Sequence, residues 1–355
     1  MDLKKFDRKK KKIHPKLLYM NIDTLHSQII IGTEKGIKLF DIKPFSKVFS
    51  VKGTTFSIVE LMYSSFLSLV GQGDPPTMSP RRVFFYNYKE DKNYEGIMLE
   101  EGIISLKQNK ERFVVITSKK IHIYELPDLK KLETLDCSNE KGLCDLSREK
   151  SILAYPSVEN AGNLELYDTL ARKPMKTIKC HKSAISSIAF NSQGTLLATT
   201  SEKGTIIRIF DMNHLEKRKY KFRRGTTNAK IYNMAFSSKS RFLCLTSNRP
   251  TVHIFKIPIN EKADKSTLDS IISNTFDLGR SFASISINSN SPHLCGFLFS
   301  NFESLDNDFL NDKFEKDEEN SVVLLSAEGI VYIYTFDPKK GGKCKLESQN
   351  MLFKK

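Results

Sequence analysis

Residues 204–211 read Gly-Thr-Ile-Ile-Arg-Ile-Phe-Asp, a turn residue followed by alternating apolar residues and an aromatic. Alternation over a few residues predicts a half-buried β-strand. The same pattern returns along the chain at 36–41, 83–87, 121–125, 162–168, 251–255 and 329–334. Most successive aromatic residues of these segments lie about 38 to 46 residues apart, which is the period of a four-stranded propeller blade. The sequence therefore predicts a closed ring of short antiparallel strands.

The chain contains no tryptophan, so the Trp-Asp dipeptide of standard WD40 repeats is absent from every repeat. We therefore expect an all-β fold, a seven-bladed β-propeller of divergent WD40-like repeats. The propeller is expected to span residues 17–345, after a basic tail at 1–16 and before a C-terminal tail at 346–355. The apolar segment at 17–20 is expected to close the ring against the last repeat.

Composition limits the classes of function. The 355 residues are 39% hydrophobic, enough for one large all-β domain or two ordinary ones. No run of about 18 apolar residues predicts a transmembrane helix, and the N-terminus lacks the apolar region of a secretory signal. The six cysteines have no CxxC spacing, which indicates reduced cytosolic thiols rather than disulfides or zinc. A net charge of +15 implies an anionic partner, either a phospholipid surface or nucleic acid.

The stretch 221–225, Lys-Phe-Arg-Arg-Gly, follows the 204–211 segment. Successive side chains of an extended segment point to opposite faces, so Arg223 and Arg224 are predicted to diverge and to serve two sites. A guanidinium group is permanently charged and presents a planar fork of donors that fits phosphate oxygens. The alternative is a solvated basic turn, since charge pairs are common on protein surfaces.

The tetrapeptide 222–225 resembles the FRRG motif of the PROPPINs, β-propellers that bind polyphosphoinositides. Further stretches resemble the same family in the family's order, at 139–144, 153–156, 194–208 and 337–344. The resemblance covers nearly the whole chain after the basic tail. It implies two headgroup sites on one rim of the propeller, one on each side of the arginine pair.

The first site implied by this resemblance would use His181, Ser201, Thr205, Arg208 and Arg223. The second would use Arg224, Thr227, Lys230, Ser247 and Thr251. Arginine forks would supply charge-assisted bonds to a phosphomonoester, and hydroxyl groups would supply neutral donors that fix its orientation. The alternatives are structural: His181 and Ser201 as an internal tether, Arg208 as a salt bridge between blades, and Lys230 as a solvated lysine. Arg249 and Pro250 stand where the family more often has small polar or acidic residues, and Pro250 restricts the backbone there.

Two long connections follow the sixth repeat. The first, 260–280, has the spacing of a short amphipathic helix and matches the PROPPIN loop that inserts into the bilayer. Its apolar residues are Leu268, Ile271, Ile272 and Phe276. The second, 301–320, is acidic and is expected to be a solvated insertion. The loop 71–80 resembles the family's second-blade loop, where effector proteins are thought to dock.

The sequence carries no P-loop, zincin motif or nucleophile elbow, so we expect no enzyme, no cofactor and no metal. We expect a phosphoinositide-binding peripheral membrane effector, monomeric in solution, that reads phosphatidylinositol 3-phosphate or the 3,5-bisphosphate. It would act in the cytoplasm, on endosomal, vacuolar or autophagic membranes, and recruit autophagy or trafficking machinery such as a lipid-transfer partner. The alternative is a WD-repeat protein–protein scaffold without a lipid ligand. Nucleic-acid binding is not expected, because no basic face carries interleaved aromatic residues.

Overall fold

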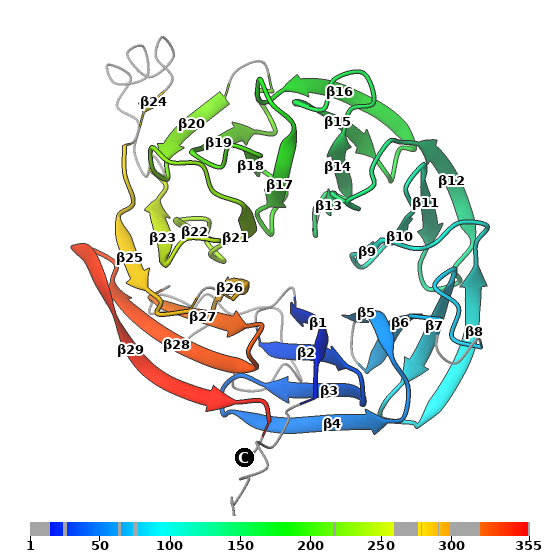
Figure 1. Ribbon diagram of the computed structural model, residues 1–355. Helices are drawn as coiled ribbons and strands as arrows, with labels where there is room; N and C mark the ends of the chain where they lie inside the picture. The colour runs from blue at the N-terminus through cyan, green and yellow to red at the C-terminus, as the bar shows by residue number, and fades with distance from the viewer. Residues whose placement is uncertain are drawn as a thin grey trace, which may run out of the picture.

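The structure is a computed structural model that describes residues 15–23, 27–62, 65–73, 77–215, 218–258, 276–277, 279–289, 291–298 and 320–353. These residues contain no helix, so none of them lies in a helix that could cross a membrane. Their strands form sheets arranged radially around a central axis (Figure 1). The predicted all-β propeller is therefore confirmed.

Consecutive strands pair antiparallel in units of four, and the first three units (blades 1 to 3) come from the N-terminal third of the chain. Blade 1 contains β1 (Leu17–Ile22), β2 (Gln28–Thr33), β3 (Gly36–Asp41) and β4 (Ser46–Lys52). Blade 2 contains β5 (Phe56–Leu61), β6 (Phe66–Gly71), β7 (Arg82–Asn87) and β8 (Lys92–Met98). Blade 3 contains β9 (Ser105–Gln108), β10 (Arg112–Ile116), β11 (Lys120–Glu125) and β12 (Lys131–Asp136).

Four further units complete the ring in the described residues. Blade 4 contains β13 (Asp145–Leu146), β14 (Ile152–Pro156), β15 (Asn163–Asp168) and β16 (Lys173–Lys179). Blade 5 contains β17 (Ile185–Phe190), β18 (Leu196–Ser201), β19 (Ile206–Asp211) and β20 (Arg218–Arg223). Blade 6 contains β21 (Ile231–Phe236), β22 (Phe242–Ser247), β23 (Thr251–Lys256) and β25 (Ala283–Ser286), and blade 7 contains β26 (His293–Phe297), β27 (Ser321–Ser326), β28 (Ile330–Asp337) and β29 (Gly341–Met351).

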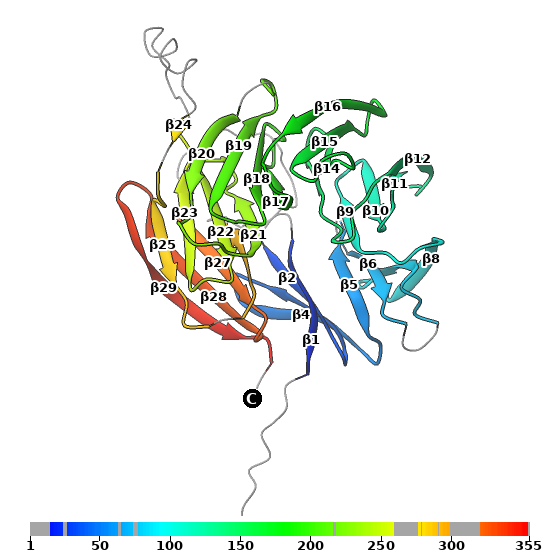
Figure 2. The same ribbon diagram turned by 45° about the horizontal axis from the view of Figure 1, so that its top comes forward.

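Two short parallel contacts supplement these units. The first, between β25 and β29, joins blades 6 and 7 into one eight-stranded sheet. In the second, β24 (Phe276–Asp277) pairs with β20 on the outer edge of blade 5. The chain that leaves blade 6 after residue 258 therefore returns along the outside of blade 5, as Figures 1 and 2 show.

The recurrent sequence segments all occupy the same place in the fold. Each forms the third strand of its blade, namely β3, β7, β11, β15, β19, β23 and β28. A third strand is flanked by a strand on either side and packs against a neighbouring blade on each face. In most of these strands one set of alternating side chains is buried and the other is only partly buried, as in β7, β15 and β19. This one-sided burial explains the two-residue period of their apolar residues.

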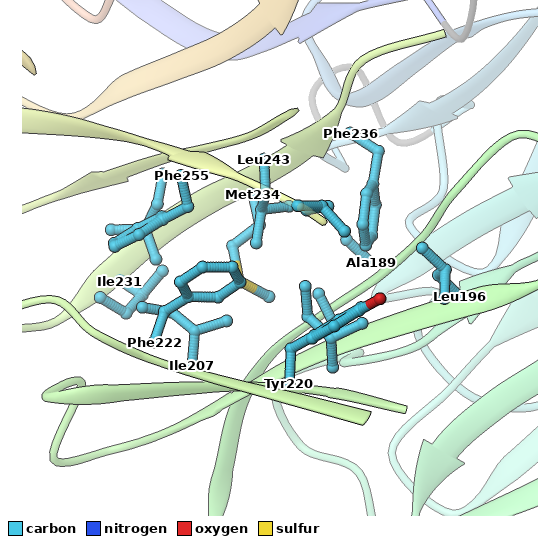
Figure 3. Packing of buried hydrophobic residues seen from close by; sticks show 14 residues of the cluster. Ala189, Leu196, Ile207, Tyr220, Phe222, Ile231, Met234, Phe236, Leu243 and Phe255 are labelled. Atoms are coloured by element: carbon cyan, nitrogen blue, oxygen red, sulfur yellow. The ribbon is translucent and has the colours of Figure 1, made fainter. Parts of the chain in front are cut away.

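The core is divided into apolar layers between neighbouring blades. The layer between blades 5 and 6 contains Phe222, Phe255, Tyr220, Ile207 and Met234, which point toward one another in Figure 3. A separate cluster joins blades 4 and 5 and includes Ile178, Leu197 and Phe210. Each blade thus contributes one face to each of two layers.

The ring closes by side-chain packing between blades 7 and 1, which are neighbours in Figure 1. Strand β1 forms its ladder with β2 of its own blade, where Ile22 pairs with Ile29. Leu17 and Met20 pack against the cluster that Ile22 shares with Val323 and Leu325 of β27. The apolar segment at 17–20 therefore contacts the last repeat but adds no strand to it, because blade 7 has its four strands from its own stretch of chain.

The C-terminal boundary lies later than the sequence predicted. Strand β29 runs to Met351, so residues 346–351 belong to blade 7 rather than to a tail. Leu352 and Phe353 are also buried, in the cluster that closes the ring. The polar residues of 346–351 lie on an outer strand and face solvent, so this segment lacks the apolar alternation of an inner strand.

Candidate functional site

The arginine pair ends β20, the outer strand of blade 5. Phe222 is almost fully buried toward blade 6, where its ring lies 5.0 Å from that of Phe255 between centroids. Because Phe222 fixes the alternation, Arg223 emerges on the opposite face and is exposed, whereas Arg224 is buried with 7% of its surface accessible. The predicted divergence of the two side chains is thus observed.

The backbone of the pair is held from two sides. Arg223 N–H donates to the carbonyl of Gly279, 2.9 Å away, in the chain that returns along β20. Arg224 N–H donates to the carbonyl of Thr205, also at 2.9 Å. The position of Arg223 therefore depends on both blade 5 and the segment that follows residue 278.

Arg224 is anchored to backbone carbonyls. Its Nε donates to Gly204 O at 2.5 Å, and its Nη2 donates to Thr227 O. Burial lowers the pKa of its guanidinium, and the nearby charge of Arg249 lowers it further. Two of its five N–H donors are used in this way, which leaves donors for an anion.

The first predicted set lies on the blade 4 side of blade 5. Arg208 of β19 pairs across the sheet with Thr199 of β18, and Thr199 Oγ1 lies 3.0 Å from His181 Nε2. Arg208 Nη1 donates to the carbonyl of Cys180. Burial and the Arg208 charge lower the pKa of His181 to about 4, so the ring is neutral at pH 7. His181 thus offers hydrogen bonding rather than charge.

The structural alternative for His181, a tether to Ser201, is not the contact observed. The ring contacts Thr199, two residues earlier on β18. Ser201 is buried at the end of that strand, and its carbonyl accepts from Gly204 N–H at 2.7 Å. Thr205 lies in the connection between β18 and β19, next to this turn. The turn therefore presents Ser201 and Thr205 at the same end of blade 5 as Arg223, whose partner in the ladder is Ile206.

The second predicted set lies on the blade 6 side. Thr227 and Lys230 are exposed in the connection from β20 to β21. Lys230 N–H donates to Asn248 Oδ1 and Asn248 N–H donates to Lys230 O, each at 2.9 Å, which ties this connection to the turn after β22. Ser247 ends β22 and is buried, and Thr251 begins β23. The connection from β20 to β21 holds the Arg224 guanidinium through Thr227 O, and Ser247 and Thr251 lie on the two strands that flank the adjacent turn.

Two residues of this region were given no binding role by the sequence reasoning. Arg249 donates from Nη2 to Asn228 O at 2.8 Å, and its charge reaches Arg224. His253 follows Thr251 by two residues on β23, and its Nδ1 lies 3.2 Å from Ser281 Oγ. Burial and the charge of Arg224 lower the pKa of His253 to about 4. The period-two alternation of β23 would have identified His253, because it shares a face with Thr251.

The predicted anchoring residues Leu268, Ile271 and Ile272 lie outside the described residues, as do most of 260–280 and the acidic insertion up to residue 319. The backbone of Phe276 lies in β24, beside Tyr220 of β20. In the part of the chain that is described, no group of three or more His, Cys, Asp or Glu side chains could hold a metal ion. The chemistry of the rim is therefore that of arginines, hydroxyl groups and neutral imidazoles.

Comparisons with known proteins identify the family. The PROPPIN family model matches residues 18–353. The chain is 32% identical to autophagy-related protein 18 of Dictyostelium discoideum, over 95% of this chain and 94% of that protein. It is 30% identical to WD repeat domain phosphoinositide-interacting protein 2 of Xenopus laevis, over 95% of this chain and 79% of that protein.

Solved structures show the same fold. Kluyveromyces lactis Hsv2 with its complete loop 6CD has a TM-score of 0.78 at 15% identity, over 96% of this chain and 100% of that one. KlAtg21, solved in complex with the coiled coil of AgAtg16, has a TM-score of 0.77 at 22% identity, over 95% of this chain and 99% of that one. Members of the matching family are non-enzymatic phosphoinositide-binding scaffolds, which confirms the prediction of a binding protein rather than an enzyme. This chain belongs to the PROPPIN family.

Proposed function

We propose that this protein reads phosphatidylinositol 3-phosphate, and also the 3,5-bisphosphate, on the cytosolic face of endosomal, vacuolar or autophagic membranes. One observation carries this proposal. Arg223 and Arg224 are adjacent in sequence, but Arg223 is exposed on the face opposite the buried Phe222, whereas Arg224 is buried and anchored to Gly204 and Thr227, so each has its own polar neighbours. Two guanidinium groups that diverge in this way can each donate to the phosphate of a separate headgroup, so they fit two headgroups better than one.

In the first site Arg223 and Arg208 supply the positive charge. His181, Ser201 and Thr205 supply neutral hydrogen-bonding groups at the same end of the blade. In the second site Arg224 and Lys230 supply the charge, with Thr227, Ser247 and Thr251 beside them. Charge-assisted bonds to a phosphomonoester are the stronger interactions, and the hydroxyl groups select its orientation.

Membrane affinity then arises from several weak contacts. Each Lys or Arg near an anionic surface contributes about 1 kcal/mol, and the chain carries a net charge of +15. Two headgroup sites on one rim raise the effective concentration of the second headgroup once the first is bound. The apolar residues of 260–280 add an anchor in the bilayer, so neither headgroup site needs high affinity alone.

The docked propeller is proposed to recruit autophagy or vesicle-trafficking proteins, among them a lipid-transfer partner. KlAtg21, which has the same fold, was solved with the coiled coil of AgAtg16. A monomeric propeller that meets the membrane at the blade 5 and blade 6 rim leaves the outer strands of blades 1 to 3 accessible to such a partner (Figure 1).

Liposome flotation tests this function. Vesicles that contain each phosphoinositide in turn are compared with vesicles of equal surface charge made with phosphatidylserine. We expect flotation with the 3-phosphate and the 3,5-bisphosphate that exceeds flotation with phosphatidylserine alone. Equal flotation on all vesicles would indicate a non-specific basic surface, and no flotation would favour the protein–protein scaffold.

A further inference from the structure

A cleft of about 390 Å³ opens on the perimeter between blades 4 and 5. Lys176, Lys179 and Arg208 line it, and none of its described lining residues is acidic. None of the residues predicted from the sequence lies in it except Arg208. The cleft is therefore a basic feature beside the first headgroup site that the family resemblance did not assign.

The strands explain why cations meet here. Lys176 of β16 precedes the buried Ile178 by two residues and lies on the same face, and Ile178 packs with Phe210 across the gap between the blades. Arg208 precedes Phe210 by two residues on β19 and faces blade 4 for the same reason. Lys176 and Arg208 thus approach the cleft from opposite blades.

The guanidinium of Arg208 is held in place rather than free to swing away. Its Nη1 donates to the carbonyl of Cys180, which also lines the cleft. The positive field of Arg208 extends at least to His181, whose pKa it helps to lower. The three cationic side chains that line the cleft make it positive, and a positive cleft attracts an anion.

The cleft and the predicted first site share Arg208. On β19 and β20, Arg208 pairs with Lys221 and Ile206 pairs with Arg223, so Arg208 and Arg223 lie on one face, two residues apart along the ladder. Diagonal neighbours of this kind on adjacent antiparallel strands lie about 7–8 Å apart. A single inositol ring with two phosphate groups could therefore contact Arg223 with one phosphate and reach the cleft with the other.

We propose that this cleft is a subsite for a second phosphate group, taken from a doubly phosphorylated inositol headgroup whose first phosphate lies between Arg223 and Arg208. The proposal rests on the proposed function. Lys176 and Lys179 then determine the preference for the 3,5-bisphosphate over the 3-phosphate. Arg208 is shared by both phosphates, so its removal weakens both headgroups.

Calorimetry with soluble headgroups tests the subsite. The double variant Lys176→Gln/Lys179→Gln is titrated with inositol 1,3-bisphosphate and with inositol 1,3,5-trisphosphate, which are the headgroups of the 3-phosphate and the 3,5-bisphosphate. We expect the unmodified protein to prefer the trisphosphate by about five- to tenfold, and the variant to lose this preference while it binds the bisphosphate unchanged. The matched control is Lys131→Gln/Lys173→Gln, which removes the same charge from exposed outer-strand lysines that do not line the cleft. The control should keep the preference.

Each other outcome overturns the proposal in a recognisable way. A preference that survives in the cleft variant overturns the subsite alone. An equal loss of affinity for both headgroups, in the cleft variant and in the control, would show only a general positive field. Inorganic phosphate is titrated as a third ligand, and saturable binding of it without any headgroup preference would indicate a site for the free anion. Failure of the unmodified protein to bind either headgroup would overturn the proposed function together with the subsite.

Discussion

The rings of Phe222 and Phe255 lie 5.0 Å apart between centroids and join the outer strand of blade 5 to the third strand of blade 6. Phe222 is almost inaccessible to solvent and Phe255 is fully buried. The contact fixes the face on which Phe222 lies and, through the alternation of β20, the opposite direction of Arg223. An apolar contact inside the propeller thus sets the arrangement of the charged groups on its rim.

Loss of this contact should therefore affect both stability and binding. Phe222→Ala is expected to lower the free energy of unfolding by about 3–5 kcal/mol, because it leaves a cavity in the layer between the blades. A double-mutant cycle with Phe255→Ala, followed by urea unfolding, should give a coupling energy of about 0.5–1.5 kcal/mol. A coupling near zero would mean that the rings contribute only independent burial.

The two arginines should differ when they are replaced one at a time. Arg223→Thr is expected to reduce flotation on phosphoinositide vesicles without a change in the melting temperature, because Arg223 is exposed. Arg224→Thr should reduce flotation and also destabilise the protein by about 1–3 kcal/mol, since Gly204 O and Thr227 O lose a charged donor. Flotation of each variant is measured beside its thermal unfolding.

Because Arg224 also supports the fold, a double variant that loses flotation must be shown to be folded. The double replacement Arg223→Thr/Arg224→Thr should still abolish flotation, but its folding must be measured. Lys131→Thr/Lys173→Thr, at two exposed lysines of outer strands, is the control for the loss of two charges alone. Flotation of the double variant equal to that of this control would remove the arginine pair from the lipid sites.

Acid should lower the free energy of unfolding, because two histidines of the rim are partly buried and neutral. The pKa of His181 and the pKa of His253 are each about 4 in the folded protein, against about 6.5 in an unfolded chain. Between these values the unfolded chain binds more protons, so the free energy of unfolding should fall as the pH falls from about 6.5 to about 4. Urea unfolding at about pH 7 and about pH 5 measures this loss.

The variant His181→Gln/His253→Gln should show a smaller change between the two pH values. His214→Gln is a suitable control, because the side chain of His214 is 85% exposed. If the control reduces the pH dependence as much as the double variant does, the buried histidines are not its source.

The ring closure between blades 7 and 1 should depend on the C-terminus. Phe353 packs in the closing cluster, and Lys38 Nζ lies 4.8 Å from the centre of its ring. Phe353→Ala is expected to cost about 3–5 kcal/mol in the free energy of unfolding. Glu347→Gln breaks an exposed ion pair with Lys43 across the same junction and should cost less than about 1 kcal/mol. Similar losses in the two variants would contradict closure by apolar packing.

The connection at 260–280 can be tested separately from the headgroup sites. Changing Ile271 and Ile272 to Asp should weaken flotation while it spares binding of a soluble headgroup measured by calorimetry. Burial of an aliphatic side chain is worth roughly 1.5–3 kcal/mol, and a charge at that depth opposes insertion. A parallel fall in both signals would show that this connection supports the fold rather than the membrane contact.

The sequence alone determined the repeat, because a two-residue apolar period marks a strand with one buried face and one partly exposed face. Most third strands of the blades have this burial, and all seven of them lie where the sequence predicted. The divergence of Arg223 and Arg224 was also predictable, since it follows from the two-residue period of a strand. The outer strand β29 was not recognised in full, because its residues face solvent and carry no apolar period.

Only the tertiary structure decided which groups meet across different blades. The proximity of His253 and Arg249 to Arg224, and the approach of Lys176 to Arg208, join residues whose distance in the sequence carries no pattern. It also decided that Arg224 is a buried, anchored cation, whereas its neighbour Arg223 is exposed. The physical reason is that strand alternation is local, whereas the burial and the field at a side chain depend on the face of the next blade.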